Sequence, residues 1–142
     1  MNTVKQLLDT KGRDVWSIAP DETVFNAIKL MAEKGIGALA VMEGDGLIGL
    51  ISERDYARKV ILKDKLSKAT SVRDIMTTPV IYTHSAQTLE ECMALMTEKR
   101  VRHLPVLEKG KLVGMVSIGD LVKAIIAEQQ FVIEQLEQYI SG

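Results

Sequence analysis

This chain contains one stretch twice: Gly49-Leu50-Ile51-Ser52-Glu53-Arg54-Asp55 and, 65 positions later, Gly114-Met115-Val116-Ser117-Ile118-Gly119-Asp120. Each copy reads as a strand that ends at a Ser, followed by a helix. A Ser at a helix start accepts from the backbone N–H three residues on, and an acidic side chain there reaches back to the N–H of the Ser. The same arrangement offers a hydroxyl, amides and a carboxylate to a phosphate and a ribose. The motif S-x-x-D therefore predicts either a helix cap or a ligand site.

A longer internal repeat surrounds the two copies. Aligning residues 15–61 with residues 80–126 without a gap gives 14 identical positions out of 47. Two units are too few for a solenoid, which needs at least three stacked repeats. We therefore expect two halves related by a pseudo-twofold axis. The first repeat, with an N-terminal turn and a linker, spans 1–71, and the second, with an extended C-terminal helix, spans 72–142.

Composition narrows the class of protein. The chain has 142 residues, enough to bury a substantial core, and its 18 basic and 19 acidic residues give no electrostatic footprint for nucleic acid. No signal-like segment opens the sequence and no run of 18 apolar residues is present, so we expect no membrane span and a cytoplasmic location. The single cysteine, Cys92, falls on a helical apolar face and is expected to be a small core residue.

Hydrophobic periodicity predicts the order β-α-β-β-α in each repeat, hence an α/β (α+β) fold. In the first repeat, Thr23 is a plausible N-cap and Gly35 closes the helix. In the second, Thr88 and Glu91 form a capping-box pair. Short glycine-containing turns join the last two strands of each repeat into a hairpin. The expected strands are 15–18, 38–42, 47–51, 103–107 and 112–116, and a brief helix at 72–77 precedes the second repeat.

Several short patterns occur in order along the chain: Asp74-Ile75-Met76-Thr77, Thr88-Leu89, Val101-Arg102-His103-Leu104-Pro105-Val106, and the two S-x-x-D copies. Together they resemble the tandem cystathionine beta-synthase (CBS) domain pair, often called a Bateman module, in its stand-alone bacterial form. The resemblance covers nearly the whole chain. It implies a non-catalytic sensor that needs no cofactor and binds AMP, ATP, NAD or a similar adenosyl ligand in clefts between the repeats. It also implies a homodimer that signals to a regulated protein, which the sequence does not name.

The resemblance also assigns ligand contacts. Asp55 and Asp120 would hold the ribose hydroxyls, while Ser52 and Ser117 would lie beside the phosphate. An ionised carboxylate accepts two hydrogen bonds from a cis-diol, which agrees with the first assignment. The adenine would lie against the first and middle strands, at Ile18, Ile36, Gly37 and Ala38 in one repeat and at Thr83, Val101 and Leu104 in the other.

Basic residues differ between the two copies. Converging basic side chains would neutralise a phosphate, and Arg offers a bidentate fork. The alternatives are a solvated helix face for Arg58 and Lys59 and a packing role for His103. The first repeat has the small residues 35–40 where the second has Arg100–Pro105, which leaves room for a ligand or closes the site. The candidate phosphate ligands are Arg54, Arg58, Arg102 and His103.

A catalytic reading finds little support. The sequence has no H-E-x-x-H, C-x-x-C or P-loop, and neither motif Ser has an evident base, so we expect no catalytic and no metal-binding residues. The main alternative to a nucleotide sensor is a structural dimerisation or interaction adaptor in which S-x-x-D only caps helices and the clefts are empty.

The C-terminal region predicts one long helix from Leu121 to about Ile140. Its apolar residues recur at spacings of three, four and seven, too many for a polar surface helix. Either the repeats of the same chain cover this stripe, or a second copy does. We expect the second copy, since twofold homodimers are common. The apolar residues are Val122, Ile125, Ile126, Val132, Ile133, Leu136 and Ile140.

Overall fold

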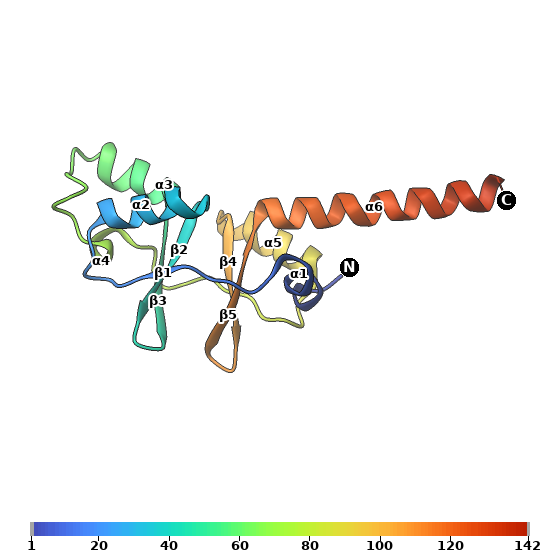
Figure 1. Cartoon of the computed structure of the whole chain (residues 1–142), viewed down its shortest axis with the longest axis horizontal. Coiled ribbons are helices and arrows are strands. Elements are labelled where there is room, and N and C mark those ends of the chain that lie inside the picture. Colours follow the sequence, from blue (N-terminus) through green and yellow to red (C-terminus); the bar gives the residue numbers. More distant parts are fainter. Residues whose placement is uncertain (1, 142) are drawn as a thin grey trace. The chain divides into compact units, whose positions relative to one another are not determined.

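The computed structural model describes residues 2–141 and has the mixed α/β fold that the sequence predicts (Figure 1). The elements follow the expected order, with strands and helices close to their predicted limits. They are α1 (Val4–Lys11), β1 (Ser17–Ile18), α2 (Val24–Lys34), β2 (Ala38–Glu43), β3 (Gly46–Ser52), α3 (Glu53–Tyr56), a π-helical turn η1 (Ala57–Ile61), α4 (Val72–Ile75), α5 (Leu89–Lys99), β4 (His103–Glu108), β5 (Lys111–Ser117) and α6 (Ile118–Ser141).

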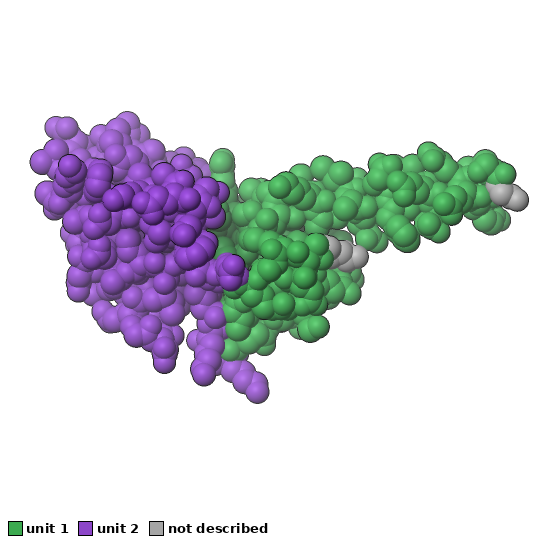
Figure 2. Space-filling view, viewed as in Figure 1, with its two compact units in different colours: residues 1–13, 82–108, 113–142 green, residues 14–81, 109–112 purple. Residues whose placement is uncertain are grey.

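The chain divides into two compact units whose limits differ from the repeat limits 1–71 and 72–142 (Figure 2). Unit 1 comprises the described residues within 1–13, 82–108 and 113–142, and unit 2 comprises 14–81 and 109–112. The segment that precedes each repeat therefore belongs to the other repeat's unit. Helix α1 lies with the second repeat, and α4 lies with the first.

Unit 2 contains a three-stranded sheet in the order β1-β2-β3. Strand β1 is parallel to β2, with Ser17 opposite Ala40, and β2 is antiparallel to β3. Helix α2 starts at the predicted N-cap, Thr23, and ends at Gly35 in the left-handed conformation, which glycine adopts without steric cost. Buried residues from α2, β2, β3, η1 and α4 form one core: Val24, Ala27, Met31, Leu39, Val41, Ile51, Val60, Val72 and Ile75.

Unit 1 has the same plan with one difference. Strands β4 and β5 form a two-stranded sheet, and α5 begins with the predicted Thr88–Glu91 capping box. The first strand of this repeat is reduced to a single parallel bridge between Thr83 and Val106. At this bridge the Thr83 N–H donates to Pro105 O, and the Thr83 carbonyl accepts from Leu107 N–H. Cys92 is buried, as predicted.

Glycines explain how the exchanged segments pack. A Cβ on Gly114 of β5 would stand 2.7 Å from Leu8 Cδ1, and one on Gly49 of β3 would stand 2.5 Å from Met76 Sδ. Real Cβ atoms do not come that close to another heavy atom, so any side chain at either position would require its neighbour to move. The glycine that opens each repeated stretch thus provides space for the segment that precedes the other repeat.

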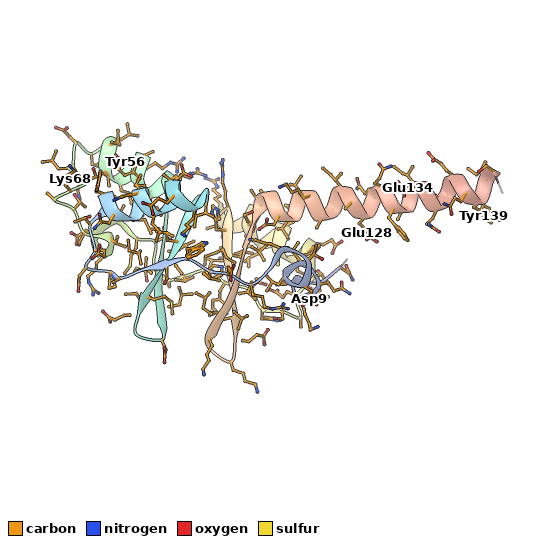
Figure 3. All side chains as sticks on the ribbon, viewed as in Figure 1. Asp9, Tyr56, Lys68, Glu128, Glu134 and Tyr139 are labelled. Atoms are coloured by element: carbon orange, nitrogen blue, oxygen red, sulfur yellow. The ribbon has the colours of Figure 1, made fainter. Side chains whose placement is uncertain are left out.

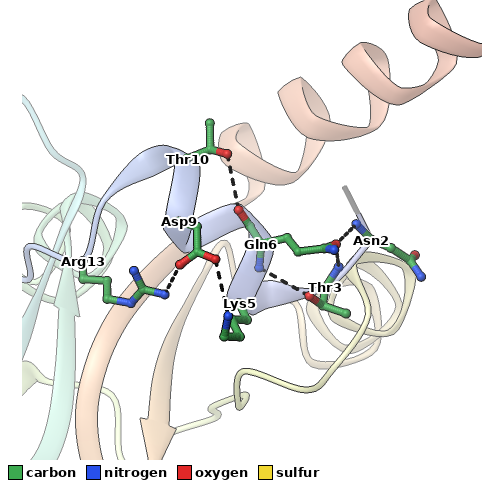
Figure 4. Close-up of polar contacts among 7 residues, drawn as sticks. All are labelled: Asn2, Thr3, Lys5, Gln6, Asp9, Thr10 and Arg13. Carbon is green, nitrogen blue, oxygen red and sulfur yellow. Dashed lines mark hydrogen bonds and ion pairs between the residues drawn. The ribbon is translucent and has the colours of Figure 1, made fainter.

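Helix α1 begins at a capping box of its own (Figure 4). Gln6 N–H donates to Thr3 Oγ1 at 3.3 Å, and Thr3 N–H donates to Gln6 Oε1 at 3.1 Å. On the outer face, Asp9 forms ion pairs with Lys5 and Arg13. The opposite face buries Val4, Leu7 and Leu8, and the helix is longer than the short turn expected from the sequence.

The predicted C-terminal helix is confirmed as α6. Leu121 and Ala124 are buried in unit 1, whereas the stripe residues beyond them are exposed, apart from the half-buried Ile125. Figure 1 shows the second half of α6 extending as a single helix away from α1 and α5 of the same unit. The described part of this chain does not cover the stripe. None of the described helices is long and apolar enough to span a membrane.

Candidate functional site

The second S-x-x-D copy forms a closed helix start where β5 meets α6. Ser117 N–H donates to Asp120 Oδ2 at 2.9 Å, and Asp120 N–H donates to Ser117 Oγ at 3.1 Å. These two reciprocal bonds satisfy backbone donors that a helix start otherwise leaves unpaired. They also fix the orientation of the Asp120 carboxylate.

A lysine from α1 binds the same carboxylate. Lys11 Nζ lies 2.6 Å from Asp120 Oδ2 and donates to Met115 O, also at 2.6 Å. Within residues 2–141, Asp120 Oδ1 accepts no hydrogen bond. Burial acts to raise the pKa of Asp120, but the bonds from Lys11 and Ser117 outweigh it and hold the pKa below its ordinary value. The result is an ionised carboxylate, fixed at one oxygen and open at the other.

The first S-x-x-D copy has the same helix cap, but different residues contact its carboxylate. Ser52 donates to Asp55 Oδ2 through both its N–H, at 2.9 Å, and its Oγ, at 3.1 Å. Thr77 Oγ1 donates to Oδ1 at 3.2 Å, and Lys59 Nζ lies 3.1 Å from the same oxygen. Lys59 also donates to Ile75 O at 3.0 Å. Both oxygens of Asp55 are therefore in use.

The residues directly before β2 and β4 accept backbone hydrogen bonds from the helix starts. Ile118 N–H donates to Arg102 O at 2.9 Å, and Glu53 N–H donates to Gly37 O at 3.0 Å. The first amide of each helix is consequently occupied and cannot bind a phosphate while these bonds persist. In this way each unit brings its motif together with one residue predicted for the site, Gly37 or Arg102.

The predicted basic residues are arranged unequally. Arg54, Arg58 and Arg102 are exposed, and none of them forms an ion pair within the described chain. His103 is half-buried. Burial lowers its pKa, and the positive charges of Lys11 and Arg102 lower it further, against a smaller opposite effect of Asp120.

The predicted adenine-lining residues range from half-buried to buried. Ile18, Ile36, Gly37 and Val101 are half-buried, whereas Ala38, Thr83 and Leu104 are buried. Leu104 has no exposed surface and is a core residue of unit 1. Thr83 Oγ1 is hydrogen-bonded to Gln87 and lies 3.4 Å from Cys92 Sγ, so its hydroxyl already has partners.

Sequence reasoning missed Lys11 and Thr77, two of the residues nearest to the motif carboxylates. Both lie in the segments that precede the repeats, and each reaches a carboxylate in its own compact unit. Lys11 begins the polar stretch Lys11-Gly12-Arg13-Asp14, and no local pattern links it to a residue 109 positions away. Within the described chain, no three His, Cys, Asp or Glu side chains are grouped so that they could hold a metal ion.

Comparisons with known proteins agree with this architecture. The family model for the CBS domain matches residues 4–62 and 72–127. The CBS domain-containing protein CBSX3, mitochondrial, of Arabidopsis thaliana is 38% identical over 151 aligned positions, which cover 99% of this chain and 72% of that protein. The chain therefore belongs to the CBS-domain family and carries two CBS domains in tandem, as its sequence resemblance implied.

Two solved structures give the fold in closely similar form. A proposed signal-transduction protein with CBS domains from Burkholderia ambifaria MC40-6 is 56% identical, with a TM-score of 0.86 over 89% of this chain and 96% of that one. The hexameric CBS-CP12 protein from bloom-forming cyanobacteria is 28% identical, with a TM-score of 0.75 over 84% of this chain and 70% of that one. Proteins with CBS domains thus include one described as a signal-transduction protein and one that forms a hexamer.

Proposed function

We propose that this protein is a non-catalytic sensor that binds an adenine nucleotide, such as AMP, ATP or NAD, and passes the ligand state to a partner protein. The main support for this proposal is that only one of the two carboxylate oxygens of Asp120 is hydrogen-bonded within residues 2–141. Its carboxylate is held at Oδ2 by Ser117 and Lys11, while Oδ1 accepts no hydrogen bond within residues 2–141. The Asp120 side chain is 20% exposed, so this oxygen is accessible to a donor from a ligand.

A ribose suits that position. Its cis-diol supplies two O–H donors to an acceptor-only carboxylate, and hydrogen bonds to a charged group are roughly twice as strong as those between neutral groups. Lys11 supports the acceptor role because it favours the ionised form of Asp120. The exposed Arg102, just before β4, forms no ion pair within residues 2–141, and its guanidinium would meet a phosphate.

The first motif supports a second candidate function, a structural interaction adaptor. Asp55 already receives Ser52, Thr77 and Lys59, which leaves it no free oxygen. A fully satisfied carboxylate is the expected state of a helix cap with no ligand. We therefore assign nucleotide binding to the second motif and a capping role to the first.

A comparison of ligands that differ at one atom tests the proposal. Calorimetry with AMP and with 2′-deoxy-AMP isolates the ribose contact without any change in the protein. AMP should bind more tightly by about tenfold, because a lost hydrogen bond to a charged group costs about 1.5–3 kcal/mol, partly offset by water. The rise in unfolding temperature with AMP, ATP or NAD shows which nucleotide binds, since a ligand at 100 times its Kd adds about 2.7 kcal/mol of stability.

Two matched variants then place the site. Asp120→Ala should abolish most of the affinity, whereas Asp55→Ala should leave the affinity largely unchanged and lower stability through loss of its cap. If no adenine nucleotide shifts the unfolding temperature, the adaptor function stands instead. If Asp55→Ala alone removes binding, the site belongs to the first motif.

A further inference from the structure

The exposed part of α6 carries a seven-residue repeat of apolar side chains. Ile126, Ile133 and Ile140 are seven residues apart, and a second row lies four residues before each of them, at Val122, Gln129 and Leu136. A third row, next to the isoleucines, consists of Ile125, Val132 and Tyr139. On a helix these rows are adjacent, so they form one continuous stripe in which only Gln129 is polar.

No part of the chain within residues 2–141 covers the stripe. Its residues from Ile126 onward are exposed, and Figure 3 shows Glu128, Glu134 and Tyr139 standing on the projecting half of the helix. The match to the CBS family model ends at residue 127, so most of the stripe lies beyond the shared domain. A contiguous apolar surface of this kind on a polar helix indicates a binding surface.

We propose that the occupant is the same helix of a second copy, packed antiparallel, in one defined register. In that register Ile126 faces the second copy's Leu136, Ile133 faces the second copy's Gln129, and Ile140 faces the second copy's Val122. The pairing is isologous, since each contact occurs twice around a twofold axis near residue 131. Overlap from Val122 to Ile140 spans about 27 Å at 1.5 Å per residue.

Charge selects the antiparallel direction. Lys123 is the last basic residue of the chain, and Glu128, Glu134 and Glu137 follow it. A parallel pair would place Glu134 and Glu137 of one copy beside the same two residues of the other, with Lys123 about two helical turns or more away. The antiparallel register puts Lys123 next to the second copy's Glu137 at both ends of the seam. The two helix dipoles also oppose each other in this direction, which is the favourable arrangement.

The polar residue within the stripe supports a defined register. The two copies of Gln129 lie about one helical turn apart across the twofold axis, near enough for their amides to pair. A slip by one heptad would bury each amide against apolar side chains without a partner, which is costly. Gln129 therefore disfavours the neighbouring registers that the isoleucine row alone would allow.

A matched pair of variants tests whether the stripe forms the interface. Leu136 and Phe131 are 56% and 57% exposed, but Leu136 lies in the stripe and Phe131 lies on the opposite face of the helix. In analytical ultracentrifugation, Leu136→Asp should raise the dimer Kd at least tenfold, whereas Phe131→Asp should leave it unchanged. An equal effect of both changes, or no effect of Leu136→Asp, overturns the proposal. Circular dichroism verifies that both variants fold.

Cysteine coupling tests direction and register. Ile126→Cys and Leu136→Cys chains, one of them carrying a mass tag, are mixed and oxidised, with the buried Cys92 left in place. The mixture should give a disulfide-linked heterodimer, and each chain alone should give little coupling. Self-coupling of Ile126→Cys would instead demonstrate a parallel pair, and absence of coupling in the mixture would rule out the register.

Charge reversal tests the pairing of Lys123 with Glu137. Lys123→Glu should weaken the dimer by about tenfold, and Lys123→Glu combined with Glu137→Lys should restore it.

Discussion

Lys11 donates to Asp120 Oδ2 at 2.6 Å, although 109 residues separate the two along the chain. This bond connects the last residue of α1 to the first turn of α6 within unit 1. It is part of the reason that the pKa of Asp120 lies below its ordinary value, because only the ionised carboxylate accepts from the ammonium. The bond therefore couples the N-terminal helix to the charge state of the candidate ligand site.

Replacing Lys11 by Met should raise the pKa of Asp120 toward 3.8. Met keeps much of the apolar stem but cannot donate. In the wild type, the stability due to this low pKa is present above pH 3.8 and is lost as the pH falls through the native pKa. Carboxylate NMR titration measures the change directly. The control is Lys5→Met, which removes one of the two ion-pair partners of the exposed Asp9 on the same helix and should leave Asp120 unaffected.

His103 should make the protein less stable in mild acid. Its native pKa is depressed by burial and by Lys11 and Arg102, so the unfolded chain binds the extra proton first. Stability should be complete above pH 6.5 and should decline as the pH falls from 6.5 toward the lower native value. Urea unfolding between pH 5 and pH 7.5 measures this slope.

The chain has two histidines, which supplies the control for that slope. His103→Asn should flatten the pH dependence in this window, whereas replacement of the exposed His84 by Asn should not. If the slope survives His103→Asn, another group is responsible for it.

Gly114→Ala should destabilise the protein by about 1–3 kcal/mol, since a methyl group at this position would collide with Leu8. Leu8→Ala should cost about 2–5 kcal/mol as a buried truncation. The double variant should be more stable than the sum of the two losses implies, because the missing Leu side chain provides room for the methyl group. Chemical denaturation of the wild type, the two single variants and the double variant gives the four unfolding free energies of this double-mutant cycle. Additive losses would show that the two residues do not share this space.

Arg102→Ala should weaken AMP more than adenosine, because only AMP carries the charge that the guanidinium would pair with. Calorimetry of both ligands gives the ratio. Arg58→Ala is the comparison, since Arg58 is equally exposed but follows the first motif. Equal losses for the two ligands would assign Arg102 a packing role, and retained affinity for both would place it in solvent.

Local patterns predicted most of the elements. The duplicated S-x-x-D identified both helix starts, and Thr23, Gly35 and the Thr88–Glu91 pair identified helix ends correctly, because caps depend on neighbours within a few residues. The first strand of the second repeat was predicted from its likeness to residues 15–18. In the structure only Thr83 makes ladder hydrogen bonds there, which sequence similarity between repeats does not reveal.

The candidate site was harder to predict than the elements. The motif residues were evident, but the partners of their carboxylates depend on which segment packs beside them. Lys11 and Thr77 lie close to Asp120 and Asp55 because the preceding segments are exchanged between the repeats. Nothing in the residues around Lys11 encodes that exchange. The close contacts of Gly49 with Met76 and of Gly114 with Leu8 are seen only in the structure.

The exchange of segments has a consequence for synthesis on the ribosome. Apart from residues 109–112, all of unit 2 lies within 14–81, so it can fold while the rest of the chain is still being made. Unit 1 must wait, because α1 emerges before residues 14–81 and its partners β5 and α6 emerge after them. Until then the buried face of α1 has no core to join, which exposes Leu7 and Leu8 to chaperones and other nascent chains. We expect protease protection of α1 to appear only in ribosome-bound chains that extend past the first turns of α6.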